Sequence, residues 1–232
     1  MGTKKRGRPP GRTEEGEETR RALYRHALQL LAERGYDGMT MRALAERAGV
    51  SPGLCYRYFP SKGAIVMALY GDLSARFAAT PLPDASWTER TLVALRASLT
   101  LLEPHRDVLA GALQVLLLDD EVGLFASASR DTRSQVQGVF VAAVTGARDA
   151  PRPAAALGRI ADLVQLALIL WLILDRSPVR RATWALVDLT ASLAPLLRVA
   201  VRVPGVPAFL ERLDVLAADA LGAPVDAPVP IP

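Results

Sequence analysis

The residues best suited to recognition chemistry stand together near the start of a short predicted helix. Pro52, Gly53 and Leu54 occupy its first turn, and Arg57 follows one turn later. An arginine guanidinium donates two parallel hydrogen bonds to a guanine edge, and an apolar side chain contacts a thymine methyl group. Arg57 is therefore the best candidate for a base contact. The structural alternatives are that Pro52 and Gly53 only shape the helix start and that Leu54 packs inside.

Two short helices joined by a tight turn are predicted over residues 40–62, and they position this group. Thr40 caps the first helix, and Gly49 suits the left-handed backbone that ends it. Ser51 caps the second helix at its DNA-facing tip, and a proline follows where no backbone donor is needed. This is helix-turn-helix geometry, whose second helix enters the DNA major groove through its N-terminal residues. An ordinary helical hairpin is the alternative.

The same segment resembles the DNA-binding domain of TetR-family transcriptional regulators over roughly residues 17–77. The matching residues are Gly35-Tyr36, Thr40, Ala45-Glu46, Ala48-Gly49-Val50-Ser51, Gly53, Tyr56, Tyr58-Phe59 and Lys62. The resemblance implies that Tyr56 and Lys62 contact phosphates and that Thr40 and Tyr58 make secondary backbone contacts. Such contacts fix the register on DNA but carry little sequence information. Gly63 departs from the family, in which an acidic residue often follows the lysine.

A basic arm is predicted over residues 1–16, which contain mainly glycine, proline and charged residues. The segment Lys4-Lys5-Arg6-Gly7-Arg8-Pro9 resembles an AT-hook, and Arg6 and Arg8 are its expected contacts with the minor groove. The physical reason is that arginine side chains favour a narrow, electronegative groove. The alternative is a solubilising tail without ordered DNA contacts.

Charge is distributed unevenly along the 232 residues, whose net charge is +4. Residues 1–79 contain 14 basic and 8 acidic residues, whereas the rest contains 14 and 16. The positive end is thus the end with the predicted DNA-binding helices, as a phosphate-facing surface requires. Cys55 is the single cysteine, which excludes an internal disulfide and fits a reducing cytoplasm.

Long stretches rich in alanine and leucine predict an all-α chain with helices throughout. We expect a DNA-binding domain at 17–79, a break at 80–84, a helical effector-binding and dimerisation domain at 80–222, and a disordered tail at 223–232. Helices of the second domain are predicted at 86–103, 105–118, 121–146, 154–175, 178–203 and 207–221.

Two of these helices, 154–175 and 178–203, are predicted to form a homodimer interface. The run Leu163–Leu174 is apolar nearly all round, which indicates burial on more than one side. The short connection between the two helices favours an antiparallel pair, and the resemblance implies that such pairs build a four-helix interface. A core helix in a monomer is the alternative. At 12 residues the apolar run is too short to cross a bilayer, so no membrane is expected.

The interior of the second domain is a plausible pocket for a small hydrophobic or amphipathic effector. Its predicted lining is Leu113, Leu117, Phe125, Phe140 and Trp171. Each of these residues is alternatively plain core.

Catalytic and metal-binding patterns are scarce in this sequence. It has two histidines, His26 and His105, and none of the motifs HExxH, GxSxG or a glycine-rich phosphate loop. We therefore expect no enzyme, cofactor or metal. The predicted function is a cytoplasmic, homodimeric repressor that an effector releases from a palindromic operator. The alternatives are an architectural DNA-binding protein without effector, and a helical ligand-binding protein or enzyme with a vestigial DNA-binding head.

Overall fold

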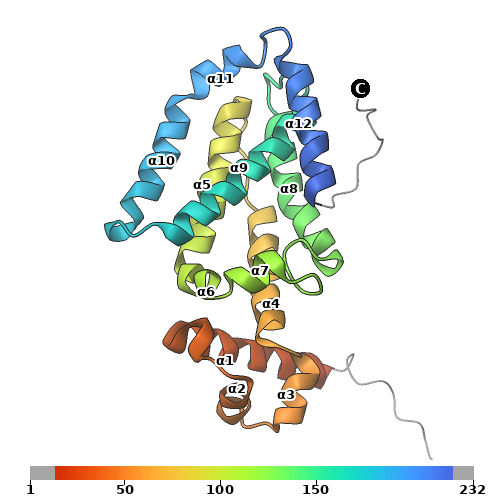
Figure 1. Cartoon of the computed structure of the whole chain (residues 1–232), viewed down its shortest axis with the longest axis vertical. Coiled ribbons are helices and arrows are strands. Elements are labelled where there is room, and N and C mark those ends of the chain that lie inside the picture. The colour runs from red at the N-terminus through yellow and green to blue at the C-terminus, as the bar shows by residue number, and fades with distance from the viewer. Residues whose placement is uncertain (1–13, 222–232) are drawn as a thin grey trace, which may run out of the picture. The chain divides into compact units, whose positions relative to one another are not determined.

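Every regular element in the described part of the chain, residues 14–221, is a helix in the computed structural model (Figure 1). This confirms the predicted all-α class. Internal contacts divide the chain into two compact units, Met1–Val66 and Met67–Pro232. Arg6, Arg8 and the predicted tail at 223–232 lie outside the described residues.

The first unit contains α1 (Glu14–Gly38), α2 (Met41–Ala48) and α3 (Pro52–Tyr58). Gly35 interrupts the helical conformation of α1 with φ 68° and ψ 179°, three residues before the end of the helix. The predicted caps of the next two helices are confirmed, because Thr40 Oγ1 accepts from Ala43 N and Ser51 Oγ accepts from Leu54 N. Gly49 ends α2 in the left-handed region at φ 66°.

Side chains from all three helices close the core of this unit. Its largest fully buried members are Leu23, Leu30, Leu31, Met39, Leu44, Phe59 and Ile65. Cys55 is also fully buried, and burial raises the pKa of its thiol. Cys55 is therefore a small, neutral core residue. Arg47 of α2 donates two hydrogen bonds to the Glu33 carboxylate of α1, at 2.8 and 2.7 Å, and so links the two helices.

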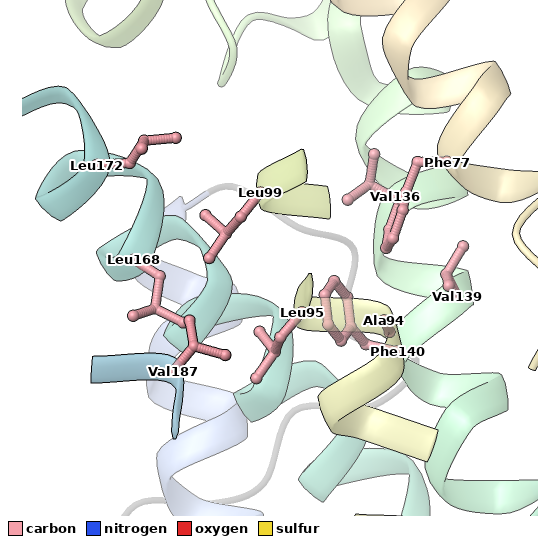
Figure 2. Close-up of a cluster of buried hydrophobic side chains, with 10 residues drawn as sticks. All are labelled: Phe77, Ala94, Leu95, Leu99, Val136, Val139, Phe140, Leu168, Leu172 and Val187. Carbon is pink, nitrogen blue, oxygen red and sulfur yellow. The ribbon is translucent and has the colours of Figure 1, made fainter. Parts of the chain in front are cut away.

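The second unit is a helical bundle in which α9 (Ala154–Leu174) packs most extensively on α8 (Arg130–Thr145) (Figure 1). Its remaining helices are α5 (Trp87–Leu102), α6 (Arg106–Gly111), α7 (Leu113–Leu118), α10 (Arg181–Ser192), α11 (Ala194–Ala200) and α12 (Val206–Leu221). Figure 2 shows the buried cluster at its centre, where the rings of Phe77 and Phe140 lie 5.5 Å apart between centroids.

The helix α4 (Lys62–Ala78) crosses the division between the units, which falls after Val66. The predicted boundary at 80–84 marks instead the break where α4 ends. A helix-breaking segment in the sequence marks only the end of a helix. The division into compact units depends instead on which side chains pack in the same core. Phe77 belongs to the core of the second unit, although it precedes the break.

Two predicted helices of this unit are corrected by the structure. The segment predicted as one helix over 121–146 begins with a loop, and α8 starts only at Arg130. Asp119 Oδ1 accepts from the backbone N–H groups of Glu121 and Val122, and this turn competes with helix formation. The segment 178–203 is likewise divided into a 3₁₀ turn, α10 and α11, because Pro195 removes a backbone donor at the junction.

The short connection between α9 and α10 is held by a carboxylate and a guanidinium. Asp175 accepts from Ser177 N at 2.8 Å and from Thr183 N and Oγ1 at 2.9 and 2.6 Å. These hydrogen bonds, with that of the Thr183 side chain the strongest, lower the pKa of Asp175. Arg106 donates to the carbonyl oxygens of Leu172 and Ile173, which satisfies acceptors at the end of α9.

The helix α9 has 21 residues and a stretch of 18 with mean hydropathy 2.0, so length and composition alone would let it cross a membrane. The prediction from sequence considered only the run 163–174, which is shorter than the apolar stretch of the whole helix. However, α9 contacts α5, α8 and α12 and carries the buried polar residues Asp162 and Gln165. Arg159 also pairs with Asp214 of α12 at 2.6 Å. These features fit the central helix of a bundle.

Close packing of α9 against α8 gives a testable difference between two glycines. A Cβ atom on Gly158 would lie 2.6 Å from Val141 Cα, whereas one on Gly138 would meet nothing within 4 Å. We expect Gly158→Ala to lower the free energy of unfolding by ~1–3 kcal/mol, because the helices must separate. Gly138→Ala should raise it by ~0.5–1 kcal/mol through helix propensity. Urea unfolding of both variants measures the difference, and equal effects would contradict the close contact.

Candidate nucleic-acid interface

Most of the predicted DNA-facing residues of the first unit lie on α3 and at its N-cap, whereas Thr40 precedes α2 and Lys62 begins α4. Six of them are exposed: Thr40, Ser51, Pro52, Gly53, Tyr56 and Arg57. Leu54 and Tyr58 are half-buried, so each has one part in the domain and one part at the surface. Ser51 caps α3, and it is exposed together with Pro52 and Gly53 of the first helical turn.

Arg57 and Tyr56 have side chains that can reach a partner. Tyr56 is 51% exposed, which is high for a large aromatic residue. The Arg57 guanidinium lies 5.4 Å from the centroid of the Tyr58 ring. Stacking on an aromatic face holds the guanidinium while its donors remain available for bidentate contacts.

Lys62 differs from these residues because its ammonium group is already engaged within the domain. Its Nζ donates to the Tyr36 carbonyl oxygen at 3.0 Å and lies 4.5 Å from the centroid of the Tyr36 ring. This contact fixes the start of α4 to the end of α1. An ammonium has three donors, so a phosphate contact by Lys62 would be made in addition to this one.

Gly53 gives a prediction in which stability and binding change in opposite directions. A Cβ atom there would meet nothing within 4 Å and Gly53 lacks a positive φ, so the fold does not require glycine. We expect Gly53→Ala to raise the free energy of unfolding by ~0.5–1 kcal/mol. We also expect it to weaken DNA binding about tenfold, because a glycine there lets the backbone approach the DNA closely.

Thermal unfolding and fluorescence anisotropy on duplex DNA measure the two effects separately. Gly138→Ala is the matched control, because it makes the same change on an exposed, open position of α8. A stabilised Gly53→Ala protein with unchanged DNA affinity would remove Gly53 from the interface.

Positive charge is concentrated outside the described helices of the first unit. Residues 14–66 contain eight basic and seven acidic residues, whereas residues 1–13 contain five basic residues and no acidic one. Two of the eight are paired with carboxylates, because Arg47 binds Glu33 and Arg42 binds Glu46 at 3.0 Å. The positive charge of the DNA-binding end therefore comes mainly from residues 1–13, which the charge count over residues 1–79 conceals.

A cavity of ≈ 340 Å³ lies within the second unit, between α4, α5, α6, α7, α8 and α9. Leu113, Leu117 and Phe125, which were predicted to line an effector pocket, line this cavity. The structure corrects the assignment of Phe140 and Trp171, which do not line it. Phe140 is fully buried in the core cluster, and Trp171 is 48% exposed on α9.

Six polar side chains also line this otherwise apolar cavity: Tyr70, Ser74, Ser98, Arg133, Asp162 and Gln165. None of them was among the residues predicted from sequence to line the pocket. Asp162 and Gln165 could have been noticed as two polar residues within the predominantly apolar sequence of α9. Their meaning depends on neighbours from α4, α5 and α8, which no local pattern supplies.

Metal ligands do not gather within the described range, where no three His, Cys, Asp or Glu side chains could hold an ion together. His105 has a lowered pKa, because burial and the charge of Arg76 disfavour its protonated form. No second histidine or cysteine accompanies it there.

The capped α2–α3 pair with its exposed helix tip defines a helix-turn-helix DNA-binding protein. The sequence profile described as "Bacterial regulatory proteins, tetR family" matches residues 23–69. Residues 23–69 therefore form a TetR-type DNA-binding domain, which is the domain of a family of transcriptional regulators.

Relatives by sequence share this regulatory class. The uncharacterised HTH-type transcriptional regulator YdeS of Bacillus subtilis is 36% identical over 89 residues, 38% of this chain and 41% of YdeS. The HTH-type transcriptional repressor KstR of Mycobacterium tuberculosis is 35% identical over 77 residues, 33% of this chain and 32% of KstR. The chain thus spans less than half the length of these curated relatives.

Solved structures support the fold over a longer range. A TetR-family regulator from Streptomyces coelicolor has a TM-score of 0.53 at 21% identity, covering 89% of this chain and 86% of that one. A protein of unknown function from Rhodococcus sp. has a TM-score of 0.55 at 23% identity, covering 75% and 94%. At these identities the likeness establishes the fold alone.

Proposed function

We propose that this chain is a homodimeric repressor that binds a palindromic operator and is released by a small, mainly apolar effector. The observation that carries DNA binding is the exposed first turn of α3, where Ser51, Pro52 and Gly53 protrude beside Arg57. In this geometry the N-terminal residues of the second helix read base edges. Arg57 is the proposed base contact, and Tyr56, Tyr58, Thr40 and Lys62 are proposed contacts to phosphates.

The proposal of a dimer rests on exposed apolar side chains of the second unit. Monomeric proteins seldom expose large contiguous apolar surfaces. In α9–α12, large apolar residues that are more than 40% exposed include Val164, Trp171, Leu174, Leu189, Leu193, Leu196, Leu197, Val199, Phe209 and Leu216. This set overlaps the two segments predicted to form the dimer, 154–175 and 178–203, and extends into α12. A two-fold protein also matches the symmetry of a palindromic site.

The proposal of an effector rests on the cavity of ≈ 340 Å³. This volume is within the range of small-molecule sites, and its lining is mainly apolar. Release from DNA requires the effector to bind one state of the dimer more tightly than the other. Such a protein acts where chromosomal DNA is, in the cytoplasm.

Selection of bound sequences from random duplex DNA, with the full chain at near-physiological salt, tests this proposal. We expect a palindrome with half-sites about one helical turn apart. Recovery of A·T-rich DNA without symmetry would favour the architectural alternative. Failure to recover any enriched sequence would contradict operator binding.

A further inference from the structure

Five polar residues form one wall of the cavity, and the ligand chemistry that they imply depends on the proposed role of this cavity as an effector site. These residues come from four helices: Tyr70 of α4, Ser98 of α5, Arg133 of α8, and Asp162 and Gln165 of α9. Polar groups placed in an otherwise apolar pocket fix the orientation and the identity of a ligand.

Gln165 has a hydrogen-bonding atom without a partner among residues 14–221. The residue is only 4% exposed and lines the cavity. Its Nε2 donates to Ser98 Oγ at 2.6 Å, whereas its buried Oε1 accepts no hydrogen bond. A buried acceptor without a donor is costly, and native proteins seldom leave one. Gln165 Oε1 is therefore the atom in this wall that most needs a donor from a ligand.

The charges beside Gln165 are balanced without a ligand. Asp162 is 6% exposed, and burial raises its pKa to about 6, although Arg133 and a hydrogen bond from Gln137 oppose that rise. The Arg133 guanidinium also donates to the Leu221 carbonyl oxygen and stacks 5.0 Å from the Phe125 ring centroid. At neutral pH one anion and one cation thus share this wall.

Tyr70 adds a neutral group to the same wall. Burial raises its pKa to about 12, and Asp162 contributes to the rise, so the phenol stays protonated. A ligand carboxylate placed here would add a second negative charge beside Asp162 in a poorly solvated site. Like charges in such a site are strongly disfavoured.

We propose that this cavity binds an uncharged, mainly apolar molecule that ends in an alcohol hydroxyl, and that this hydroxyl donates its hydrogen bond to Gln165 Oε1. The remainder of the molecule lies against the leucines of α6 and α7, where Leu109, Leu113 and Leu116 line the cavity. The ligand oxygen keeps its lone pairs and can accept in turn from a neighbouring donor in the wall.

The cavity volume limits the size of this molecule. An apolar cavity of about 150 Å³ accommodates benzene. A cavity of ≈ 340 Å³ therefore accommodates roughly a dozen non-hydrogen atoms. A ten-carbon primary alcohol has this size, so 1-decanol is a suitable probe.

Isothermal titration of the full-length protein, without DNA, compares 1-decanol with 1-methoxydecane and decanoate. The ether has the same chain and accepts hydrogen bonds but cannot donate one, and decanoate is charged. We expect 1-decanol to bind about tenfold more tightly than the ether, as one buried hydrogen bond provides, and more tightly than decanoate. Absence of 1-decanol binding, or equal or tighter binding of either comparison compound, would overturn the proposal.

The variant Gln165→Leu tests whether the side chain of Gln165 causes the preference for 1-decanol over the ether. We expect the alcohol-to-ether ratio to fall from about ten to about one, with the affinity for the ether retained. Gln114→Leu is the matched control, because Gln114 is exposed on α7 and does not line the cavity. An unchanged ratio in a folded Gln165→Leu protein would overturn the assignment, and the wild-type comparison remains decisive if that variant does not fold.

Release of DNA is measured in a separate titration with the same three compounds. If 1-decanol binds with the expected preference but leaves the DNA complex intact, the inference on ligand chemistry stands and effector release fails. If the ether or decanoate binds better and releases DNA, the proposed regulation stands and this inference fails.

Discussion

Deletion of residues 2–13 is expected to weaken DNA binding by about 10²–10³-fold near physiological salt. These residues contain Lys4, Lys5, Arg6, Arg8 and Arg12, whereas residues 14–66 have nearly equal numbers of basic and acidic residues. Each phosphate that a basic residue neutralises adds about 0.9 to the slope of log affinity against log salt. We therefore expect the slope of the deleted protein to be smaller by up to about 4.5 for each protomer bound.

Fluorescence anisotropy over a range of salt concentrations gives both numbers from one titration series. A deletion of residues 223–232 is the matched control, because that segment is of similar length and contains no lysine or arginine. If the N-terminal deletion changes neither the affinity nor the slope, these residues do not contact DNA. The DNA-binding unit would then rely on α3 and its own few unpaired cations.

Exchange of arginine for lysine distinguishes a specific effect of the arginine side chains from the effect of their positive charge. We expect Arg6→Lys with Arg8→Lys to keep the salt slope but to reduce any preference for A·T-rich flanks. Arginine is the side chain favoured in a narrow, electronegative minor groove, and lysine keeps only the charge. An unchanged flank preference would indicate phosphate contacts instead of a groove contact.

Local chemistry explains why the DNA-binding part could be predicted so closely from sequence. Thr40 and Ser51 are caps, and a cap depends only on the next three residues of the chain. Gly49 adopts a positive φ that few other residues tolerate, so its place at a helix end is equally local. These short-range signals also set the spacing between the two helices, and hence which residues protrude.

The second unit was less predictable because its features depend on contacts between distant segments. Phe140 and Trp171 are both aromatic residues of apolar helices, yet one is in the core and the other is on the surface. The sequence does not reveal which face of each helix is covered. Asp162 and Gln165 illustrate the same limit, since they acquire a role only when Ser98 and Arg133 lie beside them.

Substitutions that break the proposed dimer are expected to weaken DNA binding strongly, as the deletion of residues 2–13 is. Leu189 of α10 and Leu196 of α11 are 58% and 66% exposed, within the proposed interface. We expect the double variant Leu189→Arg with Leu196→Arg to be monomeric, because buried unpaired charges at an interface are strongly unfavourable. Its affinity for a palindromic operator should fall by ~10²–10⁴-fold, since the second half-site contact ceases to be intramolecular.

Sedimentation velocity gives the mass, and anisotropy on the palindrome and on an isolated half-site gives the affinities. Leu118→Arg is the matched control, because Leu118 is 73% exposed but lies on α7, outside the proposed interface. A double variant that remains dimeric, or a monomer that keeps full affinity for the palindrome, would contradict the role given to this surface.

The position of these two leucines also keeps dimerisation separate from ligand binding. The helix α9 contributes to both, because Gln165 and Ile169 line the cavity while Val164 and Trp171 are exposed. A substitution on α9 would therefore disturb two properties together. Leu189 and Leu196 do not line the cavity, so we expect the double variant to retain its preference for 1-decanol over the ether. Loss of dimer with that preference intact would assign the two properties to separate residues of one bundle.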